Sequence, residues 1–203
     1  MISAEDALER LKMGNVRFVE GDLNSETLAS PARRATLVSE QNPFAIILGC
    51  SDSRAPAELI FDQGLGDLFV IRVAGNVVAP SGIGSIEYAA EQFGTRLVVV
   101  LGHSHCGAVA ATLQQLQTAA EDRSPNLKSI VGRVQPAVES VLTEIGHEDD
   151  AVIMEHAVRA NIRRSVEALN HGSEILEGLV SLDALTIIGA EYCLESGVVE
   201  FLD

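Results

Sequence analysis

The sequence has 203 residues, of which 47% are hydrophobic, so it is long enough to bury a core and is most simply one domain over residues 1–203. Its 29 acidic and 14 basic residues give a formal net charge of −15, which argues against nucleic acid and against an anionic membrane as partners. No run approaches the roughly 18 apolar residues of a membrane span, and residues 1–11 lack the apolar stretch of a signal peptide, so we expect a cytoplasmic protein.

The first forty residues predict a helical arm. Ser3 and Asp6 resemble a helix-capping pair, and the apolar residues after them predict an amphipathic helix that ends near Gly21. Prolines interrupt the polar segment that follows, where one short helix is expected over residues 33–40. Because nothing in so small a domain is obviously reserved for the first helix, we expect the arm, residues 1–40, to pack on a second copy of the chain.

Strands and helices alternate through the rest of the chain, since short apolar runs predict buried strands and longer periodic stretches predict helices. The expected strands are residues 44–49, 68–73, 97–101, 184–189 and 198–202. The expected helices are residues 57–61, 82–93, 107–120, 127–145 with an interruption at Pro136, 151–170 and 173–182. This alternation predicts an α/β fold: a central, mostly parallel sheet of about five strands, flanked by helices, whose last two strands can pair antiparallel at an edge.

Three side chains that can bind metal follow two of these strands. Cys50 comes directly after the first strand, while His103 and Cys106 follow residues 97–101, a strand that Gly102 is expected to end. The carboxyl ends of parallel strands meet at one edge of the sheet, so these side chains are expected to converge there. Thiolates with a neutral imidazole suit zinc, and three protein ligands leave one position open.

These residues also have other interpretations. Taken alone, His103 and Cys106 fit equally well a satisfied polar residue and a buried thiol, and Cys50 moves the balance towards metal. A redox disulfide between Cys50 and Cys106 lacks the Cys-x-x-Cys pattern and leaves His103 without a role. Cys193 is expected to be dispensable. Gly82-Ile83-Gly84 precedes a helix but lacks the third glycine of a dinucleotide fingerprint.

Two segments, Cys50-Ser51-Asp52-Ser53-Arg54 and His103-Ser104-His105-Cys106-Gly107, resemble the two signatures of the β-class carbonic anhydrases. That family carries a Cys-x-Asp-x-Arg segment and, further along the chain, a His-x-x-Cys-Gly segment. The likeness runs from residues 14–18 to residues 197–202 and so covers almost the whole chain. The resemblance implies a zinc lyase that hydrates CO₂ reversibly to bicarbonate and a proton.

In such an enzyme, one Zn²⁺ per chain is held by Cys50, His103 and Cys106, with water or hydroxide in the fourth place. Asp52 is placed to fix the hydroxide, and Arg54 is able to clamp Asp52 through two hydrogen bonds. Without that clamp Asp52 becomes the fourth zinc ligand, which closes the site. If the segment after the strand stays extended, these two side chains share a face with Cys50.

The resemblance also implies substrate contacts. Gln41 stands where plant-type members carry a glutamine that hydrogen-bonds the substrate oxygen across a dimer interface, and the backbone at Gly107 is among the donors expected to hold substrate. Phe69, Ala74 and Tyr88 match positions that line the apolar CO₂ pocket. The implied partners are therefore CO₂ or bicarbonate and a second copy of the chain, in a homodimer or a larger homo-oligomer.

Two other functions stay open. Some relatives of this fold use the same nucleophile to hydrolyse carbonyl sulfide or carbon disulfide. A non-catalytic homologue would keep a structural zinc or bind bicarbonate without turnover. The presence of Asp52, Arg54 and Gln41 argues against such an inactive site. Arg72 and Tyr192 match positions of an anion site in bicarbonate-inhibited relatives, but Ile47 replaces the tryptophan of that site, which makes such regulation doubtful.

Overall fold

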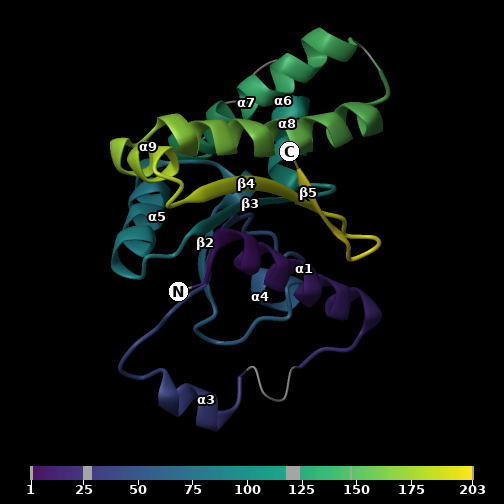
Figure 1. The fold of residues 1–203 in the computed structure, drawn as a ribbon. Helices are drawn as coiled ribbons and strands as arrows, with labels where there is room; N and C mark the ends of the chain where they lie inside the picture. Colours follow the sequence, from purple (N-terminus) through teal and green to yellow (C-terminus); the bar gives the residue numbers. More distant parts are fainter. Residues whose placement is uncertain (1, 25–28, 118–123, 147, 203) are drawn as a thin grey trace.

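The computed structural model describes residues 2–24, 29–117, 124–146 and 148–202, and its helices and strands alternate as the sequence predicts (Figure 1). In chain order the elements are α1 (Ala4–Glu20), α3 (Pro31–Thr36), β1 (Ala45–Gly49), α4 (Ala57–Ile60), β2 (Leu68–Arg72), the 3₁₀ turn η1 (Ala74–Asn76), α5 (Pro80–Gln92), β3 (Leu97–His103), α6 (Gly107–Gln117), α7 (Pro125–Ile145), α8 (Asp150–His171), α9 (Glu174–Ser181), β4 (Thr186–Tyr192) and β5 (Val199–Leu202). Within the described ranges no helix is both long and apolar enough to span a membrane.

The strands form one sheet in the order β2-β1-β3-β4-β5. All neighbouring strands are parallel except β4 and β5, which pair antiparallel at one edge. Ile46 of β1 lies opposite Val98 of β3, and Gly49 lies opposite Leu101, so these two strands finish close together. The predicted α/β fold with an antiparallel edge is confirmed, and β1 and β3 present their carboxyl ends side by side.

Helices cover both faces of the sheet, which explains why β1 and β3 are buried at every position and largely apolar. Helices α7, α8 and α9 lie over one face, and α1 and α4 lie under the other (Figure 1). The side chains of β1 and β3 alternate between two buried clusters. Those in the first cluster include Ile46, Leu48, Val98 and Val100, and those in the second include Ala45, Ile47, Leu97, Val99 and Leu101.

Helix α1 begins at the predicted cap, because the Ser3 side chain accepts a hydrogen bond from the backbone N–H of Asp6. The helix is not a free arm, however. Leu11 is fully buried in the second cluster of its own chain. Asn15 donates to the carbonyl of Gly197 and accepts from the N–H of Val199, each at 2.9 Å. The argument that nothing in the domain is reserved for this helix was wrong, and a partner contact of the arm stays a prediction.

The expected end of the third strand at Gly102 was also wrong. Strand β3 continues through His103, because Gly102 pairs with Glu191 and His103 pairs with Tyr192 in β4. Glycine serves packing here, since a Cβ at this position would lie 2.6 Å from the side chain of Ile162 in α8. The extension places His103 on the rigid sheet and not in a turn.

Two helices differ from prediction. Helix α3 starts earlier than residues 33–40, because Ser30 caps its first turn and a proline occupies a first-turn position, where its missing N–H costs nothing. Helix α7 runs through Pro136 without a break. Gly132 stands four residues earlier, where a helical proline crowds the backbone, and it adds no side chain to that crowding. Of the helix expected over residues 107–120, the part after residue 117 lies outside the described residues.

Candidate metal centre

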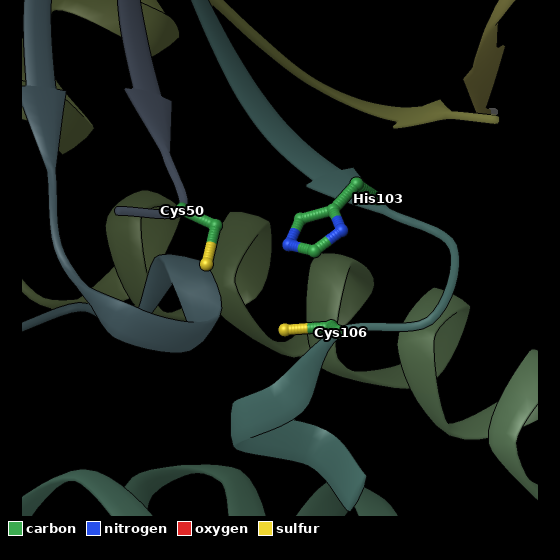
Figure 2. Close-up of side chains that lie close together, drawn as sticks. All are labelled: Cys50, His103 and Cys106. Atoms are coloured by element: carbon green, nitrogen blue, oxygen red, sulfur yellow. The ribbon is translucent and has the colours of Figure 1, made fainter. Parts of the chain in front are cut away.

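Cys50, His103 and Cys106 converge at the carboxyl ends of two neighbouring strands, as predicted. Cys50 follows β1, His103 is the last residue of β3, and Cys106 directly precedes α6. Their three potential ligand atoms lie within 4.8 Å of one another, and all three residues are buried. Figure 2 shows both sulfur atoms and the imidazole ring turned towards one shared space. This separation and this orientation suit three ligands of a single ion.

The imidazole of His103 is prepared to bind a cation. Its Nδ1 lies 2.9 Å from the carbonyl oxygen of Ser104. A carbonyl only accepts, so Nδ1 carries the proton and Nε2 presents its lone pair. Nε2 is buried and has no hydrogen-bond partner among the described residues. A buried nitrogen without a partner is costly, and a metal ion in the shared space would satisfy it.

The two thiols have unlike pKa values because they lie against each other. A hydrogen bond from the Cys106 thiol, helped by the backbone N–H of Gly75, lowers the pKa of Cys50 to about 4 although burial opposes the shift. The neighbouring Cys50 sulfur and burial raise the pKa of Cys106 far above its usual value. Two adjacent thiolates in a buried place need a cation between them. The donor set of two sulfurs and one neutral nitrogen therefore fits Zn²⁺.

Asp52 and Arg54 form the predicted two-point ion pair beside this cluster. Arg54 Nε lies 2.9 Å from Asp52 Oδ1, and Arg54 Nη2 lies 2.8 Å from Oδ2. The guanidinium holds the pKa of Asp52 well below its usual range. Asp52 Oδ2 is also 3.8 Å from Nε2 of His103, so the carboxylate borders the metal position.

The backbone conformation that forms this ion pair differs from the extended one that was expected. The segment after β1 is not extended, because the backbone N–H of Arg54 donates to Asp52 Oδ1 at 2.9 Å and that of Ala55 donates to the Asp52 carbonyl at 3.1 Å. The carboxylate thus organises a tight turn and brings the guanidinium back onto itself. A turn of this kind holds both residues of the pair by backbone as well as side-chain bonds.

Arg72 supports the same turn, a role that the sequence analysis missed. From the end of β2 it donates to the carbonyl of Cys50 at 2.9 Å and to the carbonyl of Asp52 at 2.5 Å. Tyr192, the other residue matched to an anion site, is buried, with its ring against that of Phe18. In the sequence, Arg72 is marked only as a charged residue near the end of an apolar run, which does not show what it contacts.

Gly75 is a second residue that sequence reasoning missed. Its backbone N–H donates to Cys50 Sγ at 3.3 Å. The residue has φ of +69°, and a Cβ there would lie 3.0 Å from the Cβ of Ala108, so both conformation and space call for glycine. A glycine three residues after the end of β2 was the only sequence signal.

The predicted substrate residues are less closely grouped. Gly107 begins α6, directly after the last cysteine of the cluster, and Ala74 begins η1. The rings of Phe69 and Tyr88 lie 6.3 Å apart between β2 and α5, and Tyr88 is 52% exposed. Gln41 borders a surface hollow of about 560 Å³ together with Tyr88. The substrate roles of these five residues stay predictions.

A mostly parallel sheet whose strand ends bring two cysteines and a histidine to one buried point defines an α/β protein able to hold a metal ion. Comparisons with known proteins identify which kind. Residues 45–199 match the family model described as carbonic anhydrase. The sequence is 38% identical over 193 residues to carbonic anhydrase 2 of Mycobacterium tuberculosis, which covers 94% of this chain and 89% of that protein.

A carbonic anhydrase of Mycolicibacterium smegmatis is also 38% identical, over 194 residues that cover 96% of this chain and 91% of the relative. Among solved structures, the β-carbonic anhydrase CcaA matches with a TM-score of 0.77 and 29% identity, covering 97% of this chain and 95% of that chain. The chain therefore belongs to the β-carbonic anhydrase family, as its sequence predicts, and its enzyme class is that of the carbonate dehydratases.

Proposed function

We propose that the chain is a zinc-dependent carbonic anhydrase that reversibly hydrates CO₂ to bicarbonate and a proton. The observation that carries the proposal is the buried cluster of Cys50, His103 and Cys106, whose imidazole Nε2 lacks a partner within the described structure. Three protein ligands leave a fourth position open for reaction. When bound, zinc acidifies water at that position and so supplies hydroxide near neutral pH.

The residues around the cluster have separate roles in this proposal. Cys50, His103 and Cys106 would hold the ion at a buried position. The carboxylate of Asp52, ionised by its contact with Arg54, would accept a hydrogen bond from the oxygen nucleophile and orient it. Arg54 also occupies both carboxylate oxygens, which keeps Asp52 from binding the ion itself.

Substrate recognition needs little polarity, because CO₂ carries no charge and no donor. We assign the apolar surface for CO₂ to Phe69, Ala74 and Tyr88. The backbone N–H of Gly107 and the side chain of Gln41 would hold the substrate oxygens, with Gln41 supplied by the partner subunit.

This assignment requires a homodimer, because Gln41 would come from the partner subunit. Strand β2 lies at an edge of the sheet with its side chains only partly covered, and α3 has no buried residue and stands apart from the sheet (Figure 1). Val38, Leu65 and Tyr88 are exposed around the hollow that Gln41 borders. Apolar residues gathered in this way mark protein interfaces. The structures of two carbonic anhydrases from Sordaria macrospora, which share this fold, are described as tetrameric.

The test combines zinc analysis with stopped-flow CO₂ hydration of the same preparation. We expect one zinc per chain and rapid hydration. Sulfide release from carbonyl sulfide and carbon disulfide is assayed in parallel, and faster turnover of either compound would replace the CO₂ assignment. Full zinc content without turnover of any of the three compounds would instead identify a non-catalytic homologue.

A further inference from the structure

Two polar side chains are buried beneath the metal centre on helix α8. This helix packs its apolar face on the sheet, yet Asn161 and Ser165 on the same face are only 2% and 5% exposed. An amide or hydroxyl group in such a place is costly unless it is hydrogen-bonded. Their partners therefore show what these residues do.

Both side chains reach the η1 turn, which follows β2. Asn161 Nδ2 donates to the carbonyl of Gly75 at 2.8 Å, and Ser165 Oγ donates to the carbonyl of Asn76 at 3.2 Å. The opposite side of the same turn faces the metal centre, because the N–H of Gly75 points at Cys50 Sγ. Gly75 is thus held between the ligand sulfur on one side and Asn161 on the other.

The conformation of this turn needs such support. Gly75 and Asn76 both have positive φ, at 69° and 45°. Two successive left-handed residues are uncommon outside tight turns, and glycine in particular has many other conformations of similar energy. A fixed hydrogen bond to the Gly75 carbonyl restricts the rotation of that residue. The direction of its N–H towards the sulfur then depends on what holds the carbonyl, together with the hydrogen bond from the Asn76 N–H to the Val73 carbonyl that closes the turn.

We infer that Asn161 is a positioning residue of the metal centre, which acts through Gly75 to keep an N–H donor on Cys50 Sγ. An N–H···S bond draws charge from the thiolate, so the sulfur donates less to the metal and the metal stays a stronger Lewis acid. This matters in a site with two thiolates, whose donation is high. The inference rests on the proposed function, because it requires a metal on Cys50.

The experiment replaces Zn²⁺ by Co²⁺ in the full-length protein and records the thiolate-to-cobalt charge-transfer band. The test variant is Asn161→Leu, which fills a similar volume without a donor. Without the donor, Gly75 can turn its N–H away, the sulfur gives up charge more easily, and the band should shift to longer wavelength. Ser165→Ala is the matched control, since it removes a buried bond to the same turn one peptide further from the sulfur.

A purely structural role predicts that both variants lower the melting temperature and leave the band in place. A band at the wild-type wavelength in folded Asn161→Leu would overturn the inference, and so would an equal shift in Ser165→Ala. Asn161→Ala serves as a second test variant, and failure of both Asn161 variants to fold would assign the residue to stability alone. The absence of any charge-transfer band in the wild-type protein would instead overturn the proposed metal site.

Discussion

Replacing Arg54 by alanine should close the metal centre. Of the three hydrogen bonds that hold the Asp52 carboxylate, the substitution removes the two from the guanidinium and leaves the one from the backbone N–H. The freed carboxylate is an oxygen ligand beside a metal with an open position. We therefore expect Asp52 to become the fourth ligand and to exclude the attacking hydroxide.

The structure shows how small the closing movement is. Two ligand atoms of one tetrahedral zinc, each at about 2.0–2.2 Å from the metal, are roughly 3.4 Å apart. Asp52 Oδ2 already lies 3.8 Å from Nε2 of His103. Relative to that nitrogen, the carboxylate oxygen would need to approach by only a few tenths of an ångström, and the Arg54 guanidinium holds it in its present place. Hydroxide competes less well at low pH, and closure should be strongest there.

The assay is stopped-flow CO₂ hydration, with zinc content measured on the same sample. Arg54→Ala should keep its zinc and lose activity on the order of 100-fold, the usual effect of removing a group that orients proton transfer. A crystal structure of the variant should show Asp52 on the metal. Arg54→Lys restores the charge without the planar fork and should rescue only part of the activity. Full turnover by zinc-loaded Arg54→Ala would refute the reasoning.

Three further predictions concern metal binding and stability. Cys50→Ala or Cys106→Ala should abolish zinc binding and activity together in metal analysis and hydration assays, while Cys193→Ala should change neither. Removing zinc with a chelator should lower the melting temperature by roughly 10 °C, reversibly, because at about 1,000 times Kd a ligand adds about 4 kcal/mol to the free energy of unfolding. Arg17 and Asn24 lower the pKa of Asp62 despite its burial, so its stabilisation is present above about pH 4 and is lost at lower pH. Asp62→Asn should lower stability at neutral pH and flatten its acid dependence in denaturant titrations.

The sheet was predictable because each strand is marked twice in the sequence, by an apolar run and by the glycine or turn residues around it. The wrong predictions concern residue types that can have either of two structural roles. Gly102 was interpreted as a strand end, but it makes room for Ile162. Pro136 was interpreted as a break, but helix α7 tolerates it beside Gly132. A single sequence does not show which use applies, because the deciding neighbour comes from another part of the chain.

The convergence of the three candidate metal ligands was predictable for a related reason. Cys50, His103 and Cys106 combine a residue type with a place at the end of a strand, and the fold class alone then brings them together. Neither Arg72 nor Gly75 combines a metal-binding residue type with such a place. Arg72 acts on backbone carbonyls, and Gly75 acts through its own N–H, so no side-chain chemistry identifies either contact before the fold is known.

These backbone contacts decide which part of the centre can move. Arg72 holds the main chain of this segment through the carbonyls of Cys50 and Asp52, and the Gly75 N–H holds the side chain of Cys50 through its sulfur. Among the described residues, the hydrogen bonds to the Asp52 carboxylate come from the Arg54 guanidinium and the Arg54 backbone N–H. We therefore expect an open and a closed centre to differ by a side-chain rotation and not by a loop movement. Such a change needs no rearrangement of the sheet, so the choice between the two states lies with the Asp52 and Arg54 pair.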